Sequence, residues 1–267
     1  SVFALPFAYI GMVLAARGFP EWGDVLWITV AMVGARTLAM AANRIADAHL
    51  DALNPRTASR AIPRGLLTRW DMAALGTAGL VALFFAAWML NPLCLRLAPV
   101  AVVVLVGYSW TKRFTWLSHA VLGIADGMAP AGGWIAVSAS VDPPALLRAL
   151  AVACWIAGFD LIYACQDVEF DRKLRLHSVP ARFGVAAALW SSAAAHAATV
   201  ALLALVGVLL GLGWLYWVGL ALALALLVHE HTLVRPDDLS RLDVAFFNVN
   251  GYVAVIVFVF TVGGLYV

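Results

Sequence analysis

Long apolar runs recur along the whole chain and constrain its fold more than any other feature. Nine of them stand between charged or Pro/Gly breaks, near residues 1–16, 25–46, 71–90, 93–110, 116–137, 145–164, 185–210, 213–229 and 244–266. A helix needs about 20 residues to cross the ~30 Å hydrocarbon core of a bilayer. The runs are about twice as long as barrel strands and lack their alternation. The sequence predicts an all-α integral membrane protein, with nine transmembrane helices in one domain over residues 1–267.

The composition supports a bilayer environment. Hydrophobic residues make up 64% of the chain and charged residues 12%, whereas soluble domains carry about 25% charged residues. The three cysteines form no CxxC pair, so they indicate neither a zinc site nor a disulfide framework. Neither a P-loop nor a dinucleotide fingerprint occurs, and nothing indicates nucleic-acid binding. We expect a cell-membrane or inner-membrane protein whose body lies in lipid.

Basic residues indicate the orientation of the chain. If nine spans place alternate loops on alternate sides, twelve Lys and Arg residues fall on one side and three, Arg17, Arg96 and Arg148, on the other. Cytoplasmic loops carry an excess of Lys and Arg. The side with twelve basic residues is therefore predicted to face the cytoplasm.

Two acidic motifs lie at the ends of even-numbered spans, on this predicted cytoplasmic side. NRIADAHLD, residues 43–51, places Asn43, Asp47 and Asp51 at intervals of four, and YACQDVEFD, residues 163–171, repeats the spacing with Tyr163, Asp167 and Asp171. At 100° per residue such positions share one helix stripe. We expect the two acidic stripes to face each other across the bundle.

Carboxylates that lie close together in a low-dielectric environment repel one another unless cations neutralise them. Oxygen ligands suit Mg²⁺, which takes one or two carboxylates and shares its remaining positions with water and substrate phosphates. Solvated helix ends with i,i+4 pairs would explain a single motif, but two equivalent copies favour a Mg²⁺ site for a diphosphate. The predicted metal ligands are Asp47, Asp51, Asp167, Asp171 and Asn43, and basic loop residues Arg60, Arg64, Lys112 and Arg113 are candidates to hold the diphosphate.

The chain resembles the UbiA superfamily of intramembrane prenyltransferases in both aspartate motifs, in the loop NPRTASRAIPRG and in the segment YSWTKRFTWLSH. The resemblance covers essentially the full length. It implies nine helices around a central cavity, a polyprenyl diphosphate donor, and Mg²⁺ that bridges both aspartate motifs to the diphosphate.

Three further segments, SVFALPFA, GARTLAMAANRIAD and GFDLIYACQDVEFD, resemble the 4-hydroxybenzoate polyprenyltransferase-like branch, which includes members assigned to the futalosine route to menaquinone. The resemblance implies transfer of a polyprenyl group to a hydroxylated aromatic acid, 4-hydroxybenzoate-like or dihydroxynaphthoate-like, in quinone biosynthesis. The donor ionises and the aromatic ring captures the carbocation at carbon.

Two charged residues are expected deeper in the bilayer, where charges are costly and usually functional. Arg36 precedes Asn43 by two helical turns and is predicted to bind the carboxylate of the acceptor. Asp160 stands seven residues before Asp167 and is a candidate to polarise or deprotonate the phenol. The alternative is an internal ion pair of Arg36 with Asp126 or Asp160.

Two aromatic or charged features have competing interpretations. Tyr163 is a candidate to hydrogen-bond the diphosphate or a metal-bound water, or it is a tyrosine at the membrane interface. The triplet HEH at residues 229–231 is predicted to be a solvated helix end, because successive helical positions splay its histidines apart.

Other functions compete with an aromatic acid prenyltransferase. Another activity of the superfamily would use a haem, chlorophyll or glycerol-lipid acceptor. A cation-coupled transporter is a further alternative, but transporter ion sites usually lie near the bilayer midplane. The acidic motifs here stand at helix ends beside basic loops.

Overall fold

The computed structural model describes residues 4–267, without the side chains of Ala4, Val244, Phe246 and Phe247. Its elements are α1 (Ala4–Ala16), α2 (Trp22–Leu53), α3 (Arg69–Leu90), α4 (Pro92–Thr111), α5 (Ser118–Ser138), α6 (Pro143–Ala164), the 3-10 turn η1 (Cys165–Asp167), α7 (Val168–Lys173), α8 (Val179–Phe183), α9 (Val185–Leu210), α10 (Trp214–Leu233), the π-helical turn η2 (Val244–Val249) and α11 (Asn250–Gly263).

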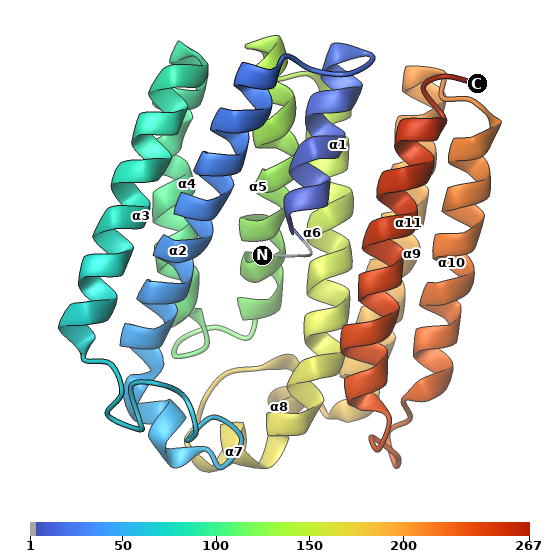
Figure 1. Cartoon of the computed structure of the whole chain (residues 1–267). Coiled ribbons are helices and arrows are strands. Elements are labelled where there is room, and N and C mark those ends of the chain that lie inside the picture. Colours follow the sequence, from blue (N-terminus) through green and yellow to red (C-terminus); the bar gives the residue numbers. More distant parts are fainter. Residues whose placement is uncertain (1–3) are drawn as a thin grey trace.

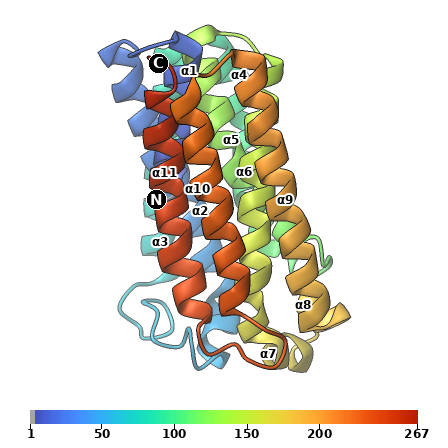
Figure 2. The same cartoon turned by 90° about the vertical axis from the view of Figure 1, so that its right-hand side faces the viewer.

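Long helices run side by side in one bundle (Figure 1). Helices α2, α3 and α4 form one flank, α9, α10 and α11 form the other (Figure 2), and α1, α5 and α6 lie between them. The short helices α7 and α8 and the loop of residues 54–68 lie at the lower end in Figure 1, which we call the polar end. The polar end carries both aspartate motifs.

The helices confirm an integral membrane protein but not the predicted count of nine spans. Within the described residues, seven helices are long and apolar enough to cross a bilayer, and two shorter apolar helices, Leu5–Ala16 and Asn250–Gly263, stand near the chain ends. Helix α2 also runs past its predicted end at residue 46, to Leu53. It stops before Pro55, because a proline disfavours helical backbone in the residue before it.

Small residues allow close helix packing at two places in the bundle, between α2 and α3 and between α5 and α6. A Cβ atom on Gly79 of α3 would lie 2.7 Å from the carbonyl oxygen of Gly34 on α2. On α5, Gly127 approaches α6 in the same way, and a Cβ atom there would lie 2.5 Å from the carbonyl oxygen of Ala149. Residues 123–127, GIADG, therefore pack closely against α6, and this GxxxG spacing of small residues is common where membrane helices meet.

The second aspartate motif is not one continuous helical stripe, so this part of the sequence prediction was wrong. Helix α6 ends at Ala164, the chain tightens into η1 as the Cys165 N–H bonds the Ile162 carbonyl, and α7 begins after Asp167. Tight 3-10 turns of this kind are common at helix ends. The turn leaves Asp167 in non-helical backbone (φ −99°, ψ 9°), one residue before α7.

The HEH triplet is also not a solvated helix end throughout. Glu230 is fully buried and its Oε1 accepts a hydrogen bond from Nδ2 of Asn250 at 2.8 Å. Nε2 of His231 lies 3.0 Å from Nδ1 of His196 on α9. Of the three residues, His229 alone is exposed. The prediction failed because α9 and α11 pack against the last turn of α10 and cover Glu230 and part of His231.

Candidate active site

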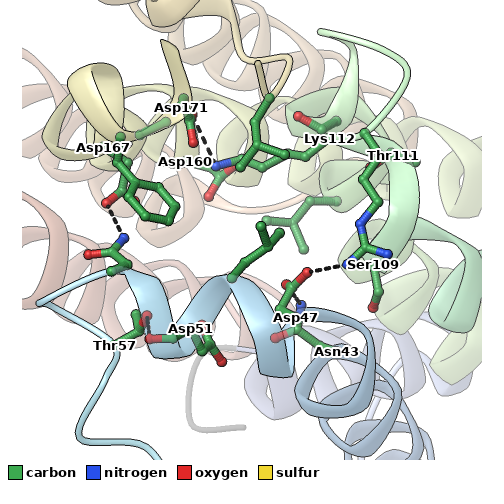
Figure 3. A pocket seen from close by; sticks show the side chains of 18 of the residues that line it. Asn43, Asp47, Asp51, Thr57, Ser109, Thr111, Lys112, Asp160, Asp167 and Asp171 are labelled. Atoms are coloured by element: carbon green, nitrogen blue, oxygen red, sulfur yellow. Dashed lines mark hydrogen bonds and ion pairs between the residues drawn. The ribbon is translucent and has the colours of Figure 1, made fainter. Parts of the chain in front are cut away.

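A cavity of about 240 Å³ lies at the polar end. Its walls come from α2 and the loop after it, from the end of α4 and the loop after it, from the start of α5, from α6, and from η1 and α7. Figure 3 shows Asp47 and Asp51 on one side and Asp167 and Asp171 on the opposite side. The cavity thus brings both aspartate motifs together, as the sequence predicts.

The α2 wall carries the first motif. Nδ2 of Asn43 donates to Oδ2 of Asp47 at 2.9 Å, and Asp47 also lies 3.2 Å from Nη2 of Arg113. Asp51 is only 5% exposed, and its Oδ1 accepts a hydrogen bond from Nη1 of Arg60 at 2.6 Å. The four-residue spacing along α2 places all three polar side chains on the cavity wall.

The opposite wall carries the second motif. Asp167 accepts hydrogen bonds from Arg56 and, at 3.1 Å, from Nδ2 of Asn54. Asp171 is 1% exposed and lies 3.4 Å from Nζ of Lys112. Arg56 also donates to the hydroxyl of Tyr163 at 2.7 Å, so Tyr163 belongs to this wall.

Each motif aspartate is therefore paired with a cation from a loop at the polar end. Burial alone would lower the pKa of the Arg56 guanidinium, but its hydrogen bond to Asp167 and the charge of that carboxylate outweigh burial and raise the pKa. Arg56 stays charged. Pairing of this kind offsets the cost of placing carboxylates in a poorly hydrated cavity.

The donor set fits Mg²⁺ if the ion shares its coordination with a diphosphate. Among the described residues, no three His, Cys, Asp or Glu side chains are grouped tightly enough to hold one metal ion. Mg²⁺, however, uses only one or two carboxylates and keeps positions for water and phosphate. Oδ2 of Asp51 is buried without a hydrogen bond, 3.8 Å from Nη1 of Arg44, and so has free coordinating capacity. The cavity therefore fits ions that share their ligands with a diphosphate.

Two predicted site residues do not line this cavity. Arg64 is exposed in the loop after α2, outside the cavity. Arg36 lines a second cavity of about 430 Å³, which is apolar and lies among α2, α3, α4 and α5. Asp126 lines the same apolar cavity. Among the described residues, Arg36 forms no ion pair with Asp126 or Asp160.

The sequence prediction missed several cavity residues, among them three polar residues of the loop after α2. Asn54, Arg56 and Thr57 follow the first motif directly, in the segment NPRTASR, and all line the cavity. The loop NPRTASRAIPRG carries part of the family resemblance and lies close to Asp51, but neither signal distinguished Arg56 from the other arginines of that loop. Asp160 does line the cavity, but its partner is His119 of α5, which the sequence prediction did not name.

A helical membrane bundle with one cavity that holds two facing pairs of aspartates and a set of loop cations has the architecture of an intramembrane enzyme for an anionic substrate. Residues 4–252 match the profile of the UbiA prenyltransferase family. The chain belongs to this family and is a membrane-embedded prenyltransferase.

Relatives and solved structures agree with this assignment. The chain is 37% identical to a 4-hydroxybenzoate octaprenyltransferase of Cupriavidus necator, over 88% of this chain and 82% of that protein. It is 32% identical to the protein of the same name from Chromohalobacter salexigens, over 92% and 82%. A UbiA homolog from Aeropyrum pernix, solved in its apo state, superposes with a TM-score of 0.89 at 36% identity and covers 97% of this chain and 95% of that one. A UbiA homolog from Archaeoglobus fulgidus bound to GPP and Mg²⁺ shares the fold, with a TM-score of 0.75 at 18% identity, over 100% of this chain and 95% of that one.

Proposed function

We propose that the protein transfers a polyprenyl group from an allylic polyprenyl diphosphate to a hydroxylated aromatic acid of the 4-hydroxybenzoate or dihydroxynaphthoate type, as a step of quinone biosynthesis. The observation that carries the proposal is the pair of aspartate motifs on opposite walls of one cavity. The relatives named 4-hydroxybenzoate octaprenyltransferase support the donor and acceptor classes.

Asp47, Asp51, Asp167 and Asp171, with Asn43, would hold Mg²⁺ in this cavity. Bound Mg²⁺ supplies Lewis-acid stabilisation of the departing diphosphate. A family member of the same fold that binds GPP and Mg²⁺ supports this choice of ion.

The loop cations would then change partners. Arg60 and Lys112 neutralise Asp51 and Asp171 as the structure stands. With the carboxylates neutralised by bound Mg²⁺, these basic side chains, together with Arg56 and Arg113, would become available to bind diphosphate oxygens, and Tyr163, which lines the same cavity, would donate a hydrogen bond to them. The charge that develops on the leaving group would be stabilised at the place where it forms.

The reaction exchanges the allylic C–O bond of the donor and one ring C–H bond of the acceptor for a new C–C bond. The allylic C–O bond breaks and its electron pair leaves with the diphosphate. The ring carbon next to the hydroxyl forms the new C–C bond, and that carbon then loses its proton to the released diphosphate. Lipid-embedded helices keep water from the allylic carbocation, which water would otherwise hydrolyse.

The acceptor is proposed to lie between the two cavities. Arg36, which forms no ion pair among the described residues, would bind the carboxylate from the side of the apolar cavity. Asp160, on the wall of the polar cavity, would face the hydroxyl. The apolar cavity offers a surface for aromatic and isoprenoid carbon.

The decisive test is product identification. Purified protein would be incubated with Mg²⁺, a labelled long-chain prenyl diphosphate and a panel of acceptors: hydroxylated benzoates and naphthoates, a porphyrin and a glycerol phosphate. Mass spectrometry should find prenylated hydroxy acids. Product with only the porphyrin or the glycerol phosphate would assign another activity of the family. Cation flux into proteoliposomes without any product would favour a transporter.

We also propose that the polar end faces the cytoplasm, because twelve basic loop residues fall on that side against three on the other. An Arg64→Cys variant provides the test, since Arg64 is exposed at the polar end. A membrane-impermeant thiol reagent should label it in inside-out vesicles and leave it unlabelled in right-side-out vesicles. The reverse labelling pattern would refute the orientation.

A further inference from the structure

His119 lies directly behind the wall of the polar cavity. It is the second residue of α5, is only 2% exposed, and does not itself line the cavity. Its Nδ1 lies 2.7 Å from Oδ2 of Asp160 on α6, and Asp160 does line the cavity (Figure 3). The histidine thus contacts the cavity wall through the carboxylate of Asp160.

A second contact decides which ring nitrogen of His119 carries the proton. The backbone N–H of Val179, the first residue of α8, donates to Nε2 of His119 at 3.4 Å. A nitrogen that accepts a hydrogen bond carries no proton, and neutral imidazole has one N–H. The proton therefore stands on Nδ1, which donates it to Oδ2 of Asp160.

This hydrogen bond leaves the other oxygen of Asp160 available. Within the described part of the chain, Oδ1 of Asp160 has no hydrogen-bond partner, and the Asp160 side chain keeps 24% of its surface exposed. Because Asp160 lines the polar cavity, this exposed surface is accessible to a bound molecule. A carboxylate fixed at one oxygen is a directed acceptor at the other.

Asp160 also differs from the other aspartates of the cavity. Five aspartates line it, and the four in the motifs are paired with Arg or Lys side chains. Asp160 is held by His119 alone among the described residues. A neutral imidazole fixes the orientation of a carboxylate without neutralising it. Asp160 therefore keeps its capacity to accept a hydrogen bond from an uncharged donor on a substrate.

We propose that His119 is a positioning residue that presents Oδ1 of Asp160 to the hydroxyl group of the aromatic acceptor. The inference rests on the proposed function and adds a residue to its acceptor site. A hydroxyl that donates to a carboxylate gains electron density on oxygen, which makes the neighbouring ring carbon more nucleophilic. The donor diphosphate would be held by the loop cations and by Mg²⁺ on the motif aspartates, so a change at His119 should leave its binding unchanged.

Two variants of His119 separate this role from a structural one. In His119→Leu no donor faces Asp160, whereas in His119→Asn the amide nitrogen takes the approximate place of Nδ1 and can donate. We expect His119→Leu to lower kcat for transfer to 4-hydroxybenzoate by about tenfold or more, the worth of one hydrogen bond to a charged group. His119→Asn should recover most of the rate. KM for the prenyl diphosphate should stay within about twofold of wild type in both.

A comparison of two acceptors, one with and one without a free hydroxyl, tests whether His119 acts on the acceptor hydroxyl. Wild type should prefer 4-hydroxybenzoate over 4-methoxybenzoate, which cannot donate, and this preference in kcat/KM should shrink by about tenfold in His119→Leu. A wild-type rate and preference in His119→Leu would overturn the inference while the proposed function stands. An equal loss of transfer rate and donor binding in His119→Leu, not restored in His119→Asn, would also overturn the inference. If wild type prenylates no hydroxylated acid, both proposals fail.

Discussion

The guanidinium of Arg56 donates to both carboxylate oxygens of Asp167, with Nη2 2.6 Å from Oδ2 and Nε 3.3 Å from Oδ1, although 111 positions separate the two residues. The contact joins the loop after α2 to η1 at the wall of the polar cavity. Arg56 also stacks over the ring of Tyr163, 5.0 Å from its centroid. One side chain thus links the loop that follows the first aspartate motif to the second motif.

Arg56→Lys should impair catalysis more than folding. Lysine keeps the charge but cannot form the planar two-point contact with a carboxylate or a phosphate. We expect kcat/KM for the prenyl diphosphate to fall by about tenfold, while the melting temperature in detergent changes little, because the Arg56 side chain is 33% exposed. Arg69→Lys, at an exposed position at the start of α3, is the matched control. Equal activity of Arg56→Lys and wild type would contradict the assignment.

Substituting a motif aspartate should abolish turnover. Asp47→Asn and Asp167→Asn keep the size of the side chain but remove the charge that a Mg²⁺ ligand needs. Transfer of a labelled prenyl group should fall by at least about 100-fold in each variant. Asp243→Asn changes an exposed carboxylate outside the cavity and should retain wild-type activity. Full activity of both motif variants with normal metal dependence would show that these carboxylates do not bind the metal.

Chelation of divalent ions should stop the reaction reversibly. EDTA should reduce product to background, Mg²⁺ should restore it, and Ca²⁺ should restore it less well, because its larger and more flexible coordination suits shared phosphate sites poorly. Binding can be followed without turnover. Mg²⁺ with inorganic diphosphate should raise the melting temperature of wild type but not of Asp167→Asn, since a ligand stabilises the state that binds it. Turnover in excess EDTA would refute metal dependence.

The two arginines of the loop after α2 should behave differently. Arg60 lines the cavity and contacts Asp51 at 2.6 Å, whereas Arg64 is exposed and outside the cavity. Arg60→Ala should raise KM for the prenyl diphosphate by about tenfold, and Arg64→Ala should change it by less than about twofold. Steady-state kinetics with varied donor concentration would measure both. An equal effect of the two substitutions would place the diphosphate nearer the loop surface than proposed.

Gly79 should be needed for the packing of α3 against α2. A Cβ atom at Gly79 would meet the carbonyl oxygen of Gly34 at 2.7 Å and the amide nitrogen of Leu38 at 2.9 Å, so the helices must separate to accept it. Gly79→Ala should destabilise the protein by about 1–3 kcal/mol. Gly107→Ala on α4 is the control, because a Cβ atom there would meet no neighbouring atom within 4 Å. Thermal unfolding in detergent distinguishes the two, and equal melting temperatures would exclude the predicted clash.

The sequence by itself determined the membrane environment and two sets of polar residues that line one cavity. Apolar runs of spanning length leave helices as the structure that satisfies the backbone in lipid, and the repeated aspartate spacing, with Asn43 and Tyr163 four residues before each pair, predicts residues that line one cavity. Both signals are local, because they depend on the period of a helix and on composition. Such local signals can be interpreted without knowledge of how the helices pack.

Only the tertiary structure decided which side chains meet. It pairs Arg56 with Asp167 and His119 with Asp160, and it separates Arg36 from the polar cavity. These contacts join segments that are distant in the chain, and their geometry depends on helix crossing, on the break at η1 and on the course of the loops. A hydrogen bond requires two atoms to lie within about 3 Å of each other. No spacing within one helix fixes a distance to another helix, so packing alone selects the partners.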